Sequence, residues 1–354
     1  MDQTRENLMV LASIDKIQDV PNTDNLQIAT VHGMAWNVII NRNDGIKEND
    51  LVVYFSIDAM IGPIVEKMME SSVMTDETKT FLSQFLKKPI RTKKIRGVWS
   101  QGLIFPLSYL EKYGIHVDEE KLDNDYLDLT SKFGITKYIS AEEENSYTEG
   151  SKFPVELVMK TDEKRIQNEP KLLQQIQDKD IVVTRKEDGS SATYILYRGV
   201  FMICSRNFIV TGYKSESSYY HEVEKMFSIE EKMKTLGRNL AIQGEVVGPK
   251  INGNRLKLME FDYRIFNIFD IDTKTYLDWN EVKDICHNNS WHTVPELYQG
   301  KCKMEWIDVK NLLSYASTIK YATKIPAEGI VIKTLNRSIS FKVISNEYLL
   351  KNNL

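Results

Sequence analysis

The alternation of apolar and polar residues predicts two different regions along this chain. From Met9 to about Leu107, short apolar runs recur between turn residues, a pattern typical of closely spaced strands. Several short strands at such spacing favour a small β-barrel of the OB type. A stretch with helical periodicity, residues 65–88, interrupts the series between the fourth and fifth predicted strands.

The second half alternates predicted strands with predicted helices, which indicates an α+β domain. Its central stretch runs from Val182 to Tyr197, where two alternating segments flank Asp188-Gly189. An Asp-Gly pair in this position is a strong hairpin signal, so we predict two strands joined by a tight turn that exposes Lys186. The helices predicted in this half are Pro170–Gln177 and about Ser218–Leu236.

A polar segment separates the two regions. Residues from about Asp123 to Gly150 end in an acidic run that is typical of a linker. We place the domain boundary near Asn145 to Lys152. The predicted domains are therefore residues 1–145, an OB-like nucleic-acid-binding domain with its linker, and residues 146–354.

Composition narrows the class of protein. The chain has 354 residues, 42% hydrophobic and 27% charged, which suits about two soluble domains. Its three cysteines show no C-x-x-C spacing, which argues against a disulfide framework and a thiolate zinc site. No signal peptide or apolar membrane span is evident. We expect a soluble, intracellular monomer that does not bind membranes; the compartment stays open.

One segment is strongly basic although the formal net charge is −4. A chain without a global positive field must bind a polyanion through local clusters of Lys and Arg. The cluster stands just before Trp99 and could form a phosphate track or only a solvated face beside a structural tryptophan. Its candidate nucleic-acid-binding residues are Lys87, Lys88, Arg91, Lys93, Lys94 and Arg96.

Residues able to do chemistry follow Lys186 in a fixed order. Alone, a lysine beside an Asp-Gly turn is ordinarily structural, and a phenylalanine in an apolar run is ordinarily core. The ordered set is Arg206, Glu245, Phe269-Asp270, Glu328, Lys333 and Lys342. This order resembles the covalent nucleotidyltransferase superfamily of RNA ligases, DNA ligases and mRNA capping enzymes, and Lys186 to Gly189 resembles its nucleotidyl-lysine motif K-x-D-G.

The N-terminal half narrows the resemblance. Residues 20–40, 49–62 and 93–107 resemble the OB-like domain that precedes the transferase domain in the RNA ligase 5 family, and Thr161–Asn168 resembles that family's lead-in to the lysine motif. DNA ligases and capping enzymes place their OB domain afterwards. The resemblance implies an OB-like β-barrel followed by an ATP-grasp-like nucleotidyltransferase domain of antiparallel sheets with flanking helices. It also implies an ATP-dependent RNA ligase that acts in RNA repair.

The resemblance also implies roles for the residues. ATP would adenylate Lys186, AMP would pass to a 5′-phosphate, and a 3′-hydroxyl would then displace it. A nucleophilic lysine must be neutral, so nearby positive charge has to favour the amine. The implied ligands of Mg²⁺ or Mn²⁺ are Asp188, Glu245 and Glu328. The implied nucleotide contacts are Lys186, Asp188, Gly189, Arg206, Glu245, Phe269 (stacked on adenine), Lys333 and Lys342.

One departure and two alternatives remain. RNA nick-sealing ligases commonly carry two lysines separated by one residue in the last motif, where this chain has Ser340-Phe341-Lys342. A DNA ligase or a GTP-using capping enzyme is one alternative. A catalytically inert RNA-binding protein on a ligase scaffold is the other. The expected partner is RNA or an RNA-containing nicked duplex.

Overall fold

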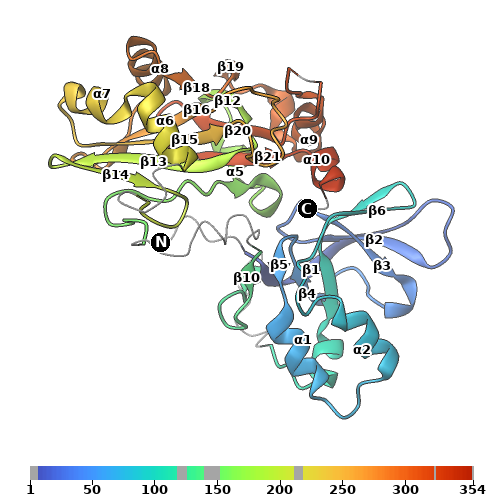
Figure 1. Ribbon diagram of the computed structural model, residues 1–354. Coiled ribbons are helices and arrows are strands. Elements are labelled where there is room, and N and C mark those ends of the chain that lie inside the picture. The colour runs from blue at the N-terminus through green and yellow to red at the C-terminus, as the bar shows by residue number, and fades with distance from the viewer. Residues whose placement is uncertain (1–6, 118–125, 139–151, 211–217, 323, 353–354) are drawn as a thin grey trace. The chain divides into compact units, whose positions relative to one another are not determined.

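A computed structural model describes residues 7–117, 126–138, 152–210, 218–322 and 324–352 (Figure 1). The chain divides into two compact units. The N-terminal unit comprises the described residues of 5–140 with 166–170 and 349–354; the C-terminal unit comprises those of 141–165 and 171–348. The predicted boundary near Asn145 to Lys152 lies outside the described residues up to position 151. The domain limits stay a prediction.

A curled antiparallel sheet forms the N-terminal unit, in the order β3-β2-β1-β4-β8 with β9 beside β1. The long strand β1 pairs with β4 and β9 through its first half and with β2 through its second half, and its ladder with β2 contains a register shift between Ile14 and Lys16. Such a bulge bends a strand. The strands are β1 (Met9–Asp19), β2 (Leu26–Val31), β3 (Asn37–Asn41), β4 (Leu51–Phe55), β8 (Leu103–Pro106) and β9 (Tyr126–Asp128).

The predicted helical interruption is confirmed as α1 (Gly62–Met69) and α2 (Asp76–Ser83). Proline near its N-terminus suits α1, and Thr75 caps α2 by accepting a bond from the Thr78 amide at 3.2 Å. The short elements of this unit are η1 (Arg42–Asp44), β5 (Ala59–Met60), β6 (Lys93–Ile95), β7 (Val98–Ser100), α3 (Leu107–Lys112), β10 (Thr136–Lys137) and η3 (Ile166–Asn168).

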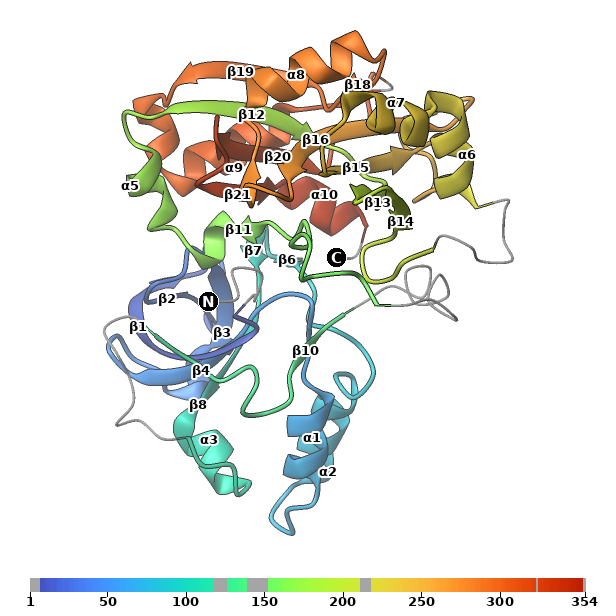
Figure 2. The ribbon, with the colours of Figure 1, turned by 90° about the vertical axis from the view of Figure 1, so that its left-hand side faces the viewer.

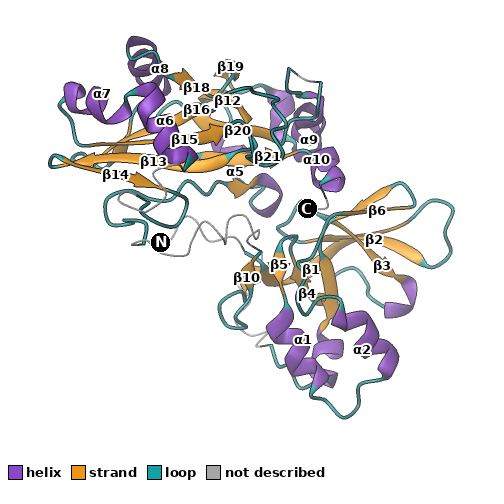
Figure 3. Cartoon of the chain, viewed as in Figure 1, coloured by secondary structure: helices purple, strands orange, loops and turns teal. Residues whose placement is uncertain are grey.

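Two sheets build the C-terminal unit (Figure 3). The first has the order β11-β21-β20-β12-β19 and the second β14-β13-β15-β16-β17, with β18 beside β16. Only the short pairs β11·β21 and β16·β18 are parallel among the described strands. The strands are β11 (Lys164–Arg165), β12 (Asp180–Lys186), β13 (Ser190–Tyr197), β14 (Val200–Cys204), β15 (Leu240–Val247), β16 (Asp262–Asp270), β17 (Thr275–Tyr276), β18 (His292–Thr293), β19 (Glu296–Lys301), β20 (Gly329–Thr334) and β21 (Ser340–Ile344).

Helices cover these sheets. Helices α6, α7 and α8 contact strands of the second sheet and lie along one face of it, over a core that contains Tyr194, Ile242 and Tyr263 (Figure 2). Helix α9 contacts β20 and β21. The helices are α5 (Leu172–Ile176), α6 (Tyr219–Phe227), α7 (Ile229–Leu236), α8 (Trp279–Asn288), η4 (Met304–Ile307), α9 (Val309–Thr318) and α10 (Asn346–Lys351).

The predicted hairpin around Asp188-Gly189 is wrong in its pairing. Both strands exist, but β12 pairs with β19 and β20, whereas β13 pairs with β14 and β15. The turn therefore joins two sheets. A Cβ on Gly189 would lie 2.3 Å from the carbonyl oxygen of Val246. Glycine is required here for close approach to β15, which sequence patterning cannot distinguish from a turn requirement.

The structure contains no helix, within the ranges it describes, that is long and apolar enough to cross a membrane.

Candidate active site

Lys186 is the last residue of β12 and pairs in register with Gly329 of β20. This register brings its side chain to the neighbouring Glu328, and Lys186 Nζ donates to Glu328 Oε2 at 2.8 Å. The hydroxyl of Tyr321 donates to the Lys186 carbonyl oxygen and accepts from the Glu328 amide, both at 3.4 Å. Tyr321 was not predicted from the sequence. It fixes the backbone of both partners.

The electrostatic surroundings keep Lys186 charged. Burial alone would lower the pKa of its ammonium group, but Glu328 and Glu245 outweigh that effect and raise the pKa above the usual 10.5. Arg206 acts in the lowering direction and is the weakest influence. Without a nucleotide, Lys186 is therefore an ammonium ion in an ion pair. Its deprotonation requires a change in the site.

Glu245 shares this carboxylate cluster. It lies on β15, in register with Ser191 of β13 and Arg264 of β16. Burial raises the pKa of its carboxyl from 4.5 to about 7, with Lys186 opposing the rise and Glu328 adding to it. Glu245 therefore titrates near neutral pH, as groups at functional sites often do.

Several of these side chains line a cavity. Its charged residues include Lys186, Glu245 and Lys333, and its apolar residues include Val294 and Val331. A cavity that combines convergent polar groups with apolar side chains is typical of a ligand site. The lining residues are Thr161, Glu163, Thr184, Arg185, Lys186, Glu187, Glu245, Phe266, Asn267, Val294, Val331 and Lys333.

Lys333 reaches the cavity from β20. Its Nζ donates to the backbone oxygen of Phe266 and to Asn267 Oδ1 at 3.1 Å, and lies 4.3 Å from the centre of the Trp279 ring. Burial and the nearby Arg337 lower the pKa of Lys333 to about 7. A group with this pKa gains positive charge readily when a phosphate enters.

The serine in the last motif stands directly opposite this lysine. Ser340 on β21 is the register partner of Lys333 on β20. A lysine at position 340 would place like charges opposite each other, which is destabilising. Lys342 is buried, is the register partner of Val331 and of Arg165, and is absent from the cavity lining. Its phosphate contact stays a prediction.

The aromatic residue at the cavity is Phe266, which was not predicted. Pairing of β15 with β16 joins Gln243 to Asn267 but Gly244 to Ile265, so Phe266 is the extra residue of a bulge. Bulges re-aim side chains and recur next to active sites. Phe269 instead packs in a separate core cluster and makes an edge contact with Tyr276 at 5.0 Å. The adenine-stacking role of Phe269 stays a prediction.

Arg206 lies close enough to the cluster to influence Lys186 and Glu245. Its guanidinium forms an ion pair with Asp162, in the segment that leads into β11. The structure therefore places Arg206 beside the carboxylate and lysine groups, although it is not a lining residue of the cavity. Its contact with nucleotide or RNA is untested.

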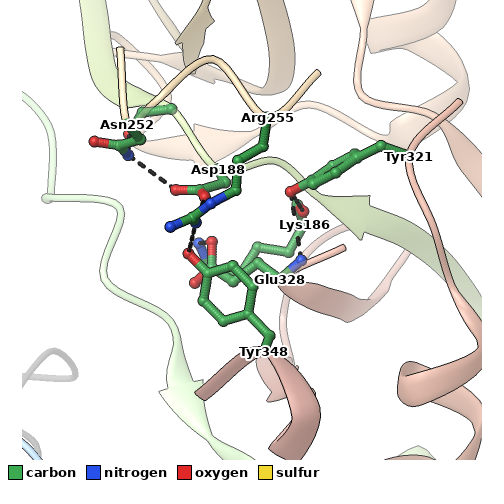
Figure 4. A network of polar contacts seen from close by, with 8 residues as sticks. Lys186, Asp188, Asn252, Arg255, Tyr321, Glu328 and Tyr348 are labelled. Atoms are coloured by element: carbon green, nitrogen blue, oxygen red, sulfur yellow. Dashed lines mark hydrogen bonds and ion pairs between the residues drawn. The ribbon is translucent and has the colours of Figure 1, made fainter. Parts of the chain in front are cut away.

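Asp188 is occupied by protein donors (Figure 4). Arg255 donates to one carboxylate oxygen and Asn252 to the other, at 2.9 Å for Asn252. In the part of the chain that the structure describes, no group of three or more His, Cys, Asp or Glu residues could hold a metal ion. Glu245 and Glu328 fit a hydrated Mg²⁺ or Mn²⁺, which prefers oxygen ligands and retains waters. Asp188 fits less well.

In the N-terminal unit, the basic segment ends in a β-hairpin of β6 and β7. Arg96 and Gly97 form its tip with positive φ angles of 50° and 85°, as a type I′ turn requires. Lys94 pairs with Trp99 and its Nζ lies 5.0 Å from the ring centre. The exposed cations of this segment are Lys87, Lys88, Lys93, Lys94 and Arg96.

Arg91 differs from the other basic residues of this segment. It is half-buried, lies 3.5 Å from an oxygen of Asp58 and stacks over the Tyr138 ring at 4.6 Å. These contacts give Arg91 a structural role. Its predicted contact with nucleic acid is untested.

The fold and the lysine-centred site define a nucleotidyltransferase domain with an N-terminal OB-like domain. Comparisons with known proteins identify the family: the RNA ligase family model matches residues 179–344, and an OB-fold domain model matches residues 8–107. Residues 179–344 form an RNA ligase domain, and the chain is an RNA ligase, as the sequence predicted. Among curated proteins, none matches it.

Solved structures of the Naegleria gruberi RNA ligase are similar over nearly the whole chain. A variant with ATP and Mn has 27% identity and a TM-score of 0.79, with 97% of this chain and 98% of that chain covered. The same ligase with PPi also has 27% identity and a TM-score of 0.79, at 98% coverage of both. A variant with AMP and Mn has 26% identity and a TM-score of 0.79, at 97% and 98%.

Proposed function

We propose that this RNA ligase uses ATP to join 3′-hydroxyl and 5′-phosphate ends through a covalent lysyl-AMP intermediate on Lys186. The observation that carries the proposal is the position of Lys186, which lines a cavity beside two carboxylates. The similar Naegleria ligase, with ATP, AMP or PPi in its solved structures, supports the choice of nucleotide.

The cavity suits an adenine nucleotide whose base lies against the apolar residues of the lining. Phe266 and Val331 are the aromatic and aliphatic side chains available for stacking. The α-phosphate would then lie near Lys186, where Lys333 adds positive charge as the phosphates arrive. Lys186 Nζ attacks the α-phosphorus, the P–N bond forms, the bond to the bridging oxygen breaks, and pyrophosphate leaves.

Proton removal from Lys186 is the main requirement of this step. Glu328 holds the ammonium at 2.8 Å, and Glu245 is the nearby carboxyl with a pKa of about 7. The proton would pass to water once a cation on the two carboxylates has removed the negative charge that pairs the lysine. A divalent cation held by Glu245 and Glu328 would stabilise the charge that develops on the phosphates.

We further propose that the N-terminal unit binds the phosphate backbone of an RNA-containing nicked duplex. The exposed cations near the β6–β7 hairpin and the adjacent Trp99 support this, because basic surfaces with aromatic side chains bind nucleic-acid strands. We expect RNA on the 3′-hydroxyl side of the nick and a monomeric enzyme.

Covalent labelling tests the proposal. Wild-type protein and the Lys186→Ala variant are incubated with ATP or GTP labelled at the α-phosphate, with Mg²⁺ or Mn²⁺, and separated by denaturing electrophoresis. We expect label from ATP on the wild type and none on the variant. Label from GTP alone would indicate a capping-type enzyme. No label, together with unchanged RNA binding by the variant, would indicate an inert RNA-binding protein.

Substrate choice needs a second assay. Nicked duplexes with RNA or DNA on the 3′-hydroxyl side are compared at equal concentration, with an intact duplex as the control for binding. Sealing that requires RNA on the 3′-hydroxyl side would support RNA as the substrate of this ligase. Equal sealing of all-DNA nicks would contradict it.

A further inference from the structure

A loop that was not predicted to be functional contacts the lysine motif. Residues 248–261 follow β15, and Asn254 closes a turn within them through bonds to the backbone of Leu258 at 2.9 and 3.0 Å. Asn252, Asn254 and Lys257 have positive φ angles, a conformation that asparagine tolerates better than most residues. The loop therefore presents Arg255 from a locally fixed backbone.

Arg255 connects the lysine motif to the start of α10 (Figure 4). Its Nη1 donates to Asp188 Oδ2 and, at 2.7 Å, to the hydroxyl of Tyr348. The guanidinium also lies 5.0 Å from the centre of the Tyr348 ring. Tyr348 is itself buried, with 5% of its surface exposed. Tyr348 thus holds the guanidinium of Arg255 in place while that group neutralises Asp188.

Asn252 holds the same turn from a second position. Its Nδ2 donates to Asp188 Oδ1 at 2.9 Å and to the Gly189 carbonyl oxygen at 2.8 Å. Asp188 is only 7% exposed, so its carboxylate needs these partners. The backbone of Gly189 also packs against Val246. The turn that follows Lys186 is therefore fixed by β15 on one side and by the 248–261 loop on the other.

We propose that Arg255 is a positioning residue for adenylation: by bridging Asp188 and Tyr348 it fixes the turn that presents Lys186, with Asn252 in a supporting role. This inference rests on the proposed adenylation of Lys186. Arg255 acts through Asp188, two residues from the nucleophile, and it does not line the nucleotide cavity. Its loss should therefore slow the covalent step and leave nucleotide affinity nearly unchanged.

The test separates rate from affinity in the full chain. Arg255→Met removes the charge and keeps the length, and Lys257→Met makes the same change at an exposed position of the same loop. The rate of labelling at saturating ATP is measured with Mn²⁺, and the dissociation constant of ATP is measured separately by calorimetry. We expect Arg255→Met to lower the rate about 10- to 100-fold, because small displacements of reacting groups have effects of this size.

Two further variants distinguish positioning from a general structural role. Arg255→Lys retains a charged donor for Asp188 but loses the planar guanidinium that lies against the Tyr348 ring, so it should recover part of the rate. Tyr348→Phe removes only one hydroxyl and should give a smaller loss of rate, with the melting temperature near that of the wild type. It also keeps the proposal testable if Arg255→Met does not fold.

Three results would overturn the inference. The first is labelling by folded Arg255→Met at the rate of Lys257→Met. The second is a loss of ATP affinity that accounts for the whole loss of rate, which would make Arg255 a nucleotide contact. The third is a wild type that is never labelled by ATP; this refutes the proposed function itself and is visible without any Arg255 variant.

Discussion

Replacing Glu245 with glutamine should stabilise the protein at pH 8 but not at pH 4.5. The pKa of Glu245 is raised from 4.5 to about 7, so the folded protein retains a proton on this carboxyl that the unfolded chain has lost. Stability from this group is fully present below pH 4.5 and is lost as the pH rises through 7. A glutamine amide is neutral throughout this range, so the variant has no such loss.

The magnitude follows from the width of this pH window. At about 1.4 kcal/mol per pH unit, the range from 4.5 to about 7 corresponds to about 3 kcal/mol. Glu245 is partly accessible through the cavity, so water screens the charge and about 3 kcal/mol is an upper bound. For a unit of this size, 1 kcal/mol shifts the melting temperature by about 2–4 °C.

Thermal and urea unfolding of wild type and Glu245→Gln, measured every half pH unit from 4.5 to 8.5, would test this reasoning. The exposed Glu260→Gln in the same unit is the matched control. The difference between Glu245→Gln and wild type should grow with pH and level off above 7. A constant difference, or one that grows toward acid pH, would refute it.

Other predictions concern catalysis and binding. Glu328→Gln should slow adenylation about 10- to 100-fold with ATP affinity nearly unchanged. Because Glu328 raises the pKa of Lys186, this variant should also move the acid limb of the pH–rate profile to lower pH. An acid limb that does not move would contradict the ion pair. Phe266→Leu should weaken ATP binding roughly tenfold, whereas Phe269→Leu should lower stability by about 1 kcal/mol; calorimetry showing the reverse would restore Phe269 as the stacking residue. Neutralising the three cations of the β6–β7 hairpin (residues 93, 94 and 96) should reduce the slope of log affinity for a nicked duplex against log salt by about 2 to 3, with adenylation retained; an unchanged slope would exclude the hairpin.

Much of the fold could be predicted because local pattern decides it. Residue periodicity alone predicts the alternating strands of the N-terminal sheet and the helical interruption that forms α1 and α2. It also predicts the strand that carries Lys186. The pairing across Asp188-Gly189 could not be predicted. Whether Gly189 turns the chain back on itself or passes it to another sheet depends on the backbone at Val246, which is distant in sequence.

In the site, too, the order of residues along the chain could be predicted, whereas the register of the strands could not. Lys186, Glu245 and Glu328 could be identified from their order along the chain, and the structure brings them together. The choice between Phe266 and Phe269 could not be made, because it depends on a single inserted residue in the β15–β16 ladder. A register shift of one residue reverses which side chains face the cavity. Arg255 was missed because its loop has no periodic signal.

The ion pair between Lys186 and Glu328 must be weakened before Lys186 can act as a nucleophile. Above pH 7, two carboxylates, Glu245 and Glu328, surround the single ammonium group of Lys186. Their excess negative charge makes Lys186 resist deprotonation. A divalent cation that arrives with the nucleotide would bind both carboxylates. It would thereby remove the negative charge that keeps the lysine protonated. Lys333, with a pKa of about 7, can take up a proton at the same moment. The nucleophile would then become reactive only when its phosphate target is present.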